Sequence, residues 1–126
     1  MIRTFFPHLL VLLVLSAAAC SSSTPRSEQG YGKVEISTET MPRSVQANES
    51  FDFIMEIRGP ELEAVHVGAI MPDTRTRMLK DVTVEQLPGD RWIARGMLLH
   101  LPGLWEVTVD LEYNGRERHY TFPIRL

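Results

Sequence analysis

The sequence predicts an all-β protein: a seven-stranded immunoglobulin-like antiparallel β-sandwich. Short runs of alternating apolar and polar residues recur along the chain, separated by Pro, Gly and Asn turn signals at near-regular spacing. This pattern is typical of an all-β sandwich. No stretch has convincing helical periodicity with helix caps. Seven runs within about a hundred residues fit an immunoglobulin-type domain.

The most regular run starts at Leu104 and is expected to be a central strand. Its apolar residues recur with a period of two, as in a strand with one buried face. The predicted inward side chains are Trp105, Val107, Val109 and Leu111. Pro102 and Gly103 turn the chain just before this strand. Immunoglobulin-type sandwiches have such a corner, locked by a large aromatic residue, so Pro102, Gly103 and Trp105 are predicted to form a structural corner.

The other six strands are expected at 33–40, 50–58, 64–71, 79–87, 91–99 and 117–125. Their predicted inward side chains are Val34 and Ile36; Phe51, Phe53, Met55 and Ile57; Val65, Val67, Ala69 and Met71; Val82 and Val84; Trp92 and Ala94; and Tyr120, Phe122, Ile124 and Leu126. Asn114-Gly115 predicts a type I′ hairpin before the last strand. Pro123 confines that strand to an edge, or to a position where its missing N–H is not needed.

Residues 1–19 predict a signal peptide. Arg3 precedes the apolar run 9–15, and small residues then lead to Cys20, which is the layout of an export signal. The run is shorter than the roughly 20 apolar residues of a membrane-spanning helix. Ala-Ala-Ala-Cys at 17–20 resembles the bacterial lipobox, with Ala17 where Leu is usual, and predicts lipidation of Cys20. The alternative is an ordinary signal peptide with a chance Cys nearby, which would leave a reactive unpaired thiol.

Residues 20–32 are expected to be the lipidated Cys and a flexible tether, because they are small and polar and contain Pro and Gly. The sandwich domain then spans 33–126. Ser21 and Ser22 follow Cys20 with no Asp. By analogy with the lipoprotein sorting rule, this predicts an anchor in the outer membrane facing the periplasm, if the source has two membranes.

Composition narrows the range of functions. Without the signal peptide the chain has 12 basic and 16 acidic residues, a net charge of −4. The basic residues form no stripe, so nucleic acid is not an expected partner. The sequence has no plausible catalytic triad, no Cys-x-x-Cys or His-x-x-x-His, and no glycine-rich phosphate loop, so the protein is not expected to be an enzyme. Arg75, Arg77 and Lys80 make a small basic loop, which is interpreted as either a solvated surface or a partner contact.

Methionine and histidine suggest one candidate site. In an up-and-down order of seven strands, three connections fall at the same end of the sandwich: first–second, third–fourth and fifth–sixth. Met41 opens the first, Met71 and Met78 bracket the second, and His100 lies in the third. Thioether and imidazole groups suit copper, especially Cu(I). The alternative is that the methionines fill the core and that His100 is solvated or bonded to a nearby carbonyl.

Two segments, Met71-Pro72 and 96–107 (GMLLHLPGLWEV), resemble the YtkA-like family of small exported immunoglobulin-fold domains, which look related to FixH-like domains. Members tend to show Met-Pro, a His-rich loop and a Met, then Gly-Met…His-Met-Pro-Gly-x-Trp-Glu. The resemblance implies metal-ligating positions at Met71, Met78, Met97 and His100. This chain departs from the pattern at 73–77 (DTRTR), where the family has histidines, and at Leu101, where it has Met.

The resemblance also implies a protein partner, because such domains often accompany periplasmic redox or copper proteins. Loss of the family histidines favours a binding or scaffolding role. The expected function is therefore a lipid-anchored, non-enzymatic accessory module for a periplasmic redox or metal-handling system. The alternative is a copper-binding protein with a Met/His site at one end of the sandwich.

Overall fold

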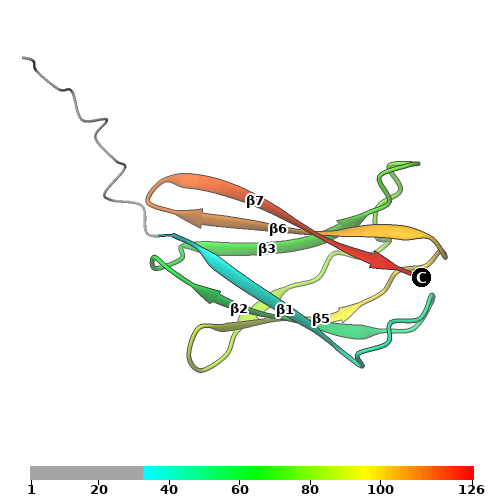
Figure 1. The fold of residues 1–126 in the computed structure, drawn as a ribbon, viewed down its shortest axis with the longest axis horizontal. Helices are drawn as coiled ribbons and strands as arrows, with labels where there is room; N and C mark the ends of the chain where they lie inside the picture. Colours follow the sequence, from blue (N-terminus) through cyan, green and yellow to red (C-terminus); the bar gives the residue numbers. More distant parts are fainter. Residues whose placement is uncertain (1–32) are drawn as a thin grey trace, which may run out of the picture.

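The computed structural model describes residues 33–126, which form two antiparallel sheets packed face to face (Figure 1). The four-stranded sheet has the order β1 (Glu35–Met41), β2 (Phe51–Arg58), β5 (Arg91–Met97), β4 (Val84–Gln86). The three-stranded sheet has the order β3 (Ala64–Ile70), β6 (Leu104–Tyr113), β7 (Arg116–Arg125). This is the strand order of a constant-type immunoglobulin sandwich, and it confirms the predicted fold class.

The predicted signal peptide, the lipidation site Cys20 and the tether lie outside the described residues. Among residues 33–126, no helix is long and apolar enough to cross a membrane.

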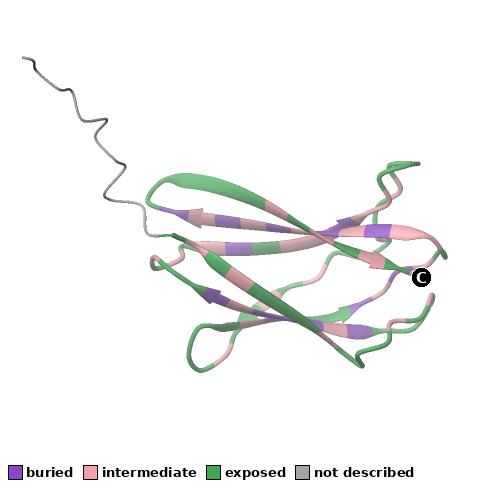
Figure 2. Cartoon of the chain, in the orientation of Figure 1, coloured by how far each residue is buried: buried purple, intermediate pink, exposed green. Residues whose placement is uncertain are grey.

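The core lies between the two sheets and follows the predicted alternation closely. The four inward side chains of β6 are fully buried: Trp105, Val107, Val109 and Leu111. The predicted inward residues of β2 are buried opposite them, and the Phe53 ring meets that of Phe122 on β7 at 6.1 Å between centroids. Figure 2 shows the buried segments along inner strands such as β2 and β6, whereas the edge strands β1 and β7 and most connections are largely exposed. Each large apolar side chain buried in this way contributes about 1.5–3 kcal/mol.

Two details of the strand predictions depend on pairing partners. β7 is an edge strand, as Pro123 predicts, because an edge position tolerates the missing N–H. The fourth strand was expected at 79–87, but only Val84–Gln86 pairs with β5. Val82 and Val84 do pack against the core. Residues 79–83 lie in the connection that crosses from one sheet to the other. Apolar and polar side chains alternate there because Val82 packs against the core, but the backbone of this segment does not pair with any described strand.

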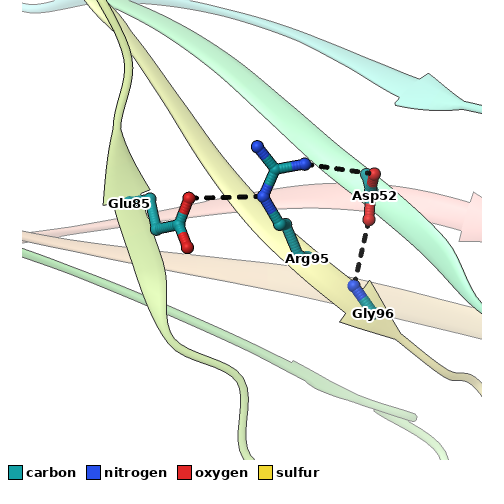
Figure 3. A network of polar contacts seen from close by, with 4 residues as sticks. All are labelled: Asp52, Glu85, Arg95 and Gly96. Carbon is teal, nitrogen blue, oxygen red and sulfur yellow. Dashed lines mark hydrogen bonds and ion pairs between the residues drawn. The ribbon is translucent and has the colours of Figure 1, made fainter.

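β5 contains a β-bulge that the sequence pattern did not predict. Two residues, Arg95 and Gly96, lie opposite the single residue Asp52 of β2. Gly96 has φ +71°, a left-handed conformation that glycine adopts without steric cost. Its N–H donates to Oδ1 of Asp52 at 3.0 Å, while the Arg95 guanidinium lies between Asp52 and Glu85 (Figure 3). The Asp52 carboxylate thus accepts the hydrogen bond of the Gly96 N–H at the bulge.

The bulge changes which residues of β5 face the core. Ala94 is buried as predicted and Trp92 packs against the core. Strict alternation from Ala94 would point Gly96 inward and Met97 outward. The extra residue reverses this parity, so Met97 and then Leu99 are both fully buried. The strand itself ends at Met97 rather than at the predicted 99.

The strand order places loops 42–50 and 98–103 and the first part of the third connection (loop 71–83), residues 71–80, at one end of the sandwich and residue 33 at the other (Figure 1). Residues 81–83 run back beside Val65, His66 and Val67 of β3. We call these two ends the loop end and the N-terminal end. Backbone hydrogen bonds tie the loop end together. The Asn48 N–H donates to the Leu99 carbonyl at 2.9 Å, and Gly103 and Leu126 exchange two hydrogen bonds at 2.9 and 3.2 Å.

Candidate functional site at the loop end

Trp105 holds loop 98–103 in place. Its indole is fully buried, and Nε1 donates to the Leu101 carbonyl at 2.9 Å. The edge of the His100 ring packs on the indole at 5.6 Å between centroids. Gly103 has φ +126°, and a Cβ there would lie 2.9 Å from the terminal methyl of Met71, so both conformation and space favour glycine. The loop therefore has one well-determined path over the core.

The structure brings two of the four predicted metal ligands to this loop. His100 is half-buried within it, and its Nδ1 atom is buried without a hydrogen-bond partner among the described residues. Met71 is half-buried and its methyl group lies against Gly103. An unsatisfied buried nitrogen is rare and calls for a partner such as water or a metal ion. His100 lies within loop 98–103, and Met71 touches the same loop at Gly103.

Three of the four predicted ligands, Met71 among them, pack against the core or lie within it. Met97 is fully buried in the hydrophobic cluster, and Met78 is half-buried against that cluster. A thioether at the position of Met97 can reach an ion at the surface only if the core repacks. Within residues 33–126, no group of three or more His, Cys, Asp or Glu side chains could hold a metal ion. A metal site at this end would have to use soft sulfur and imidazole ligands.

The last residue of β3 and the first part of loop 71–83 form a short hydrogen-bonded projection, residues 70–80, that we call the basic finger. Its backbone continues the antiparallel pairing of β3. The Met71 N–H donates to the Thr76 carbonyl at 2.8 Å, and the Met78 N–H donates to the Ala69 carbonyl at 3.2 Å. At its tip Arg75 has φ +57°, which is uncommon for a residue other than glycine. In Figure 1 this segment (green, upper right) projects outward from the end of β3.

The loop end also carries the large apolar side chains that are exposed in the described part of the chain. Met41 is 61 % exposed, Leu79 78 % and Leu101 41 %. Each belongs to a different connection: the end of β1, the basic finger and loop 98–103. Single exposed apolar residues are ordinary, but gathering at one end of a small domain is typical of an interaction surface.

Sequence reasoning identified the basic residues of the finger but not its exposed leucine. A signal was available, because Val82 and Val84 face the core and Leu79 has the opposite parity. Met78 lies an even number of residues before Val82 and Val84. The same alternation therefore predicts that Met78 faces the core and Leu79 faces solvent. The exposure of Leu101 follows from the turn at Pro102 and Gly103, whose path is not readable from alternation.

The outer face of the three-stranded sheet carries a second polar feature. His66, Asp110 and His119 lie side by side on three neighbouring strands, and Nδ1 of His119 is hydrogen-bonded to the Asp110 carboxylate. A hollow of about 430 Å³ lies beside them, with Gly68 and Thr108 among the residues that line it. The two-residue turn Asn114-Gly115 could have predicted the pairing of Asp110 with His119, since it sets the register of the hairpin.

Comparisons of the chain with protein-family models, curated proteins and solved structures return no match. The resemblance to YtkA-like domains therefore stays a prediction from the sequence.

Proposed function

We propose that this chain is a lipid-anchored, extracytoplasmic interaction module, without enzymatic activity, that assists a periplasmic redox or metal-handling protein. In this proposal Cys20 carries the lipid, residues 21–32 form the tether, and the loop end contacts the partner.

One observation carries the proposal: the chain enters the domain at one end and presents its exposed apolar side chains at the other. Residue 33 leads into β1 at the N-terminal end, whereas Met41, Leu79 and Leu101 lie at the loop end. An anchor attached before residue 33 would leave the loop end free to face away from the membrane. Hydrogen bonds join loop 42–50 to loop 98–103, and others close the start of loop 71–83 on itself and on β3, which reduces the ordering cost of binding.

Site-specific photo-crosslinking in the full-length chain tests this proposal. A photoreactive amino acid would replace Met41 or Leu101 at the loop end, and Gly89 or Asn114 at the N-terminal end as controls. We expect protein adducts from the loop-end positions, with the crosslinked protein identified by mass spectrometry as a redox or metal-handling protein. Adducts of equal yield from both ends, or none from the loop end, would contradict the proposal.

Copper binding is the second candidate, and the unpaired Nδ1 of His100 favours it. The imidazole and the Met71 thioether would hold the ion, with Met78 as a further sulfur ligand near the same end. A soft Cu(I) ion suits these donors. Met97 is not included in this reduced set, because it is fully buried in the core.

A Cu(I) titration of the mature chain against a competing chelator distinguishes this candidate from the interaction module. Stoichiometric binding that is lost in His100→Ala and kept in His119→Ala would establish a copper site at the loop end. His119 is a suitable control because it is exposed and lies on the outer face of β7. Binding no stronger than the chelator background, or equal loss in both variants, would exclude the site.

A further inference from the structure

We propose that the basic finger is the element that selects the partner, and that it docks on an acidic protein surface with an apolar recess for Leu79. This inference rests on the proposed interaction function and adds the chemistry of the partner. Its evidence comes from three properties of residues 70–80: their fixed backbone, their unpaired charges and their position.

The backbone of the finger is preorganised. The hydrogen bonds from Met71 to Thr76 and from Met78 to Ala69 close it, and Ile70 and Arg77 form a bridge pair. The hydroxyl groups of Thr74 and Thr76 lie 2.7 Å apart across the turn. These contacts hold the tip in the left-handed conformation that Arg75 adopts. Left-handed backbone at a residue other than glycine costs energy and is concentrated at functional sites.

Some cations elsewhere on the domain are paired, whereas Arg43, Arg118 and Arg125 form no ion pair with any described residue; the finger differs in holding three unpaired cations within residues 75–80. On the four-stranded sheet, Arg91 pairs with Glu39 and Arg95 pairs with Glu85. Arg75, Arg77 and Lys80 are exposed and form no ion pair with any described residue. Their charges are therefore available to a partner.

The charge of the whole domain is also distributed unevenly. Segments 42–50, 71–80 and 98–103 hold four basic and two acidic residues, whereas the rest of 33–126 holds seven basic and thirteen acidic residues. The loop end thus has a net charge of +2 and the remainder −6. Complementary charges speed association and suppress wrong partners. A positive finger at the end of a negative domain therefore favours an acidic partner surface.

The side chain of Leu79 supplies the apolar part of the contact. It is the most exposed of the large apolar side chains at the loop end, at 78 %, and it lies between Arg77 and Lys80 in the sequence. An apolar anchor surrounded by charged residues matches the usual anatomy of a protein interface, with a hydrophobic centre and a polar rim.

A protein fits this surface better than a membrane or a second copy of the chain. With a lipid at Cys20, the anchoring bilayer would lie beyond the N-terminal end, and the finger would point away from it. Copies anchored in the same bilayer would present their positive loop ends side by side, and like charges brought together at an interface are unfavourable.

The test uses the full-length chain in its native host, with a photoreactive amino acid in place of Leu79. It compares the adduct yield in three backgrounds: the otherwise unchanged chain, Arg75→Glu/Arg77→Glu, and the control Lys33→Glu/Arg118→Glu. The control reverses two cations at the N-terminal end, so its change in net charge is the same. Thermal unfolding of each variant verifies that the fold is kept.

We expect a protein adduct at position 79 whose crosslinked partner peptide is rich in Asp and Glu. Its yield should fall at least about tenfold in Arg75→Glu/Arg77→Glu, because like charges would then oppose each other at the contact. The control should keep its yield, and replacement of the partner's acidic residues by lysine should restore binding to the reversed finger.

Other results overturn the inference in distinguishable ways. One such result would be unchanged adducts from Met41 and Leu101 in Arg75→Glu/Arg77→Glu. That result would support the interaction function and show that the finger does not select the partner. A crosslink to lipid or to a second copy, or to a partner segment without acidic residues, would also overturn the inference. Absence of adducts from all three positions would remove both proposals.

Discussion

Trp105 links the stability of the core to the path of loop 98–103. We expect Trp105→Phe to lower the free energy of unfolding by about 1–3 kcal/mol, because the smaller ring leaves a cavity and the hydrogen bond to Leu101 is lost. Denaturant unfolding measures this change. Trp92→Phe is the matched control, since Trp92 is only half-buried; equal losses in both variants would contradict a special role for the Trp105 corner.

Tyr120 makes stability depend on pH in the alkaline range. Burial raises the pKa of Tyr120 above 10.0, Tyr113 raises the pKa further, and Arg118 opposes the shift. Below about pH 10 the phenol is protonated in both the folded and the unfolded chain. As the pH rises above this value, the unfolded chain loses the proton first, so stability falls until the pH passes the folded-state pKa.

Replacement of the phenol tests this account of Tyr120. Between pH 8 and about pH 11, we expect Tyr120→Phe to lose less stability than the wild type. Each protein's own stability at pH 8 is the reference for its loss. Denaturant midpoints at the two pH values give the comparison. If the variant lost as much stability as the wild type, other groups would have to cause the alkaline loss.

At the scale of single elements, the bulge in β5 decides where Met97 points. We expect Asp52→Ala to destabilise the fold by about 1–2 kcal/mol, because the Gly96 N–H loses its charged acceptor. Asp52→Asn should cost less, about 0–1 kcal/mol, since an amide oxygen can still accept and the exposed pair with Arg95 contributes little. Denaturant unfolding of both variants is the measurement, and equal destabilisation would show that charge pairing matters more than the hydrogen bond to Gly96.

Most of the fold could be predicted from the sequence because most strands have one buried face. The inward residues of β2 and β6, the edge position of β7 and the Asn-Gly turn all follow from local rules. The end of β5 did not follow, because a bulge adds one residue and reverses the alternation from Gly96 onward. The length of β4 could not be predicted either. Alternation at 79–83 shows which side chains face the core, but not whether the backbone pairs with another strand.

The candidate site could be predicted only in its location. Strand order alone placed Met71, Met78 and His100 at the loop end, and the structure has those loops together. Whether these side chains lie close together depends on how deeply each loop packs into the core. Residue type alone does not determine that depth. Arg75 illustrates the same limit, since its left-handed conformation comes from the hydrogen bonds that close the finger.

At the scale of the whole molecule, the two ends of the sandwich have separate roles in the proposed function. Residues 33–126 contain both sheets and a packed core, and we expect them to fold without the preceding segment. The anchor would then set only the place and orientation of a domain that is already folded. This separation predicts that anchoring can be removed without loss of the fold.

Cys20→Ser tests this separation directly. We expect the variant chain to leave the membrane fraction once its signal peptide is removed, because lipid attachment requires the thiol. Its thermal unfolding midpoint should stay within about 1 °C of that of the anchored protein, because the described core is built from residues of the sandwich domain. Ser21→Ala is the control, because it changes a neighbouring side chain and keeps the thiol. Membrane fractionation and thermal unfolding are the two measurements. If Cys20→Ser remained in the membrane fraction with its signal peptide removed, the lipid anchor would be wrong, and the outward orientation of the loop end would need another cause.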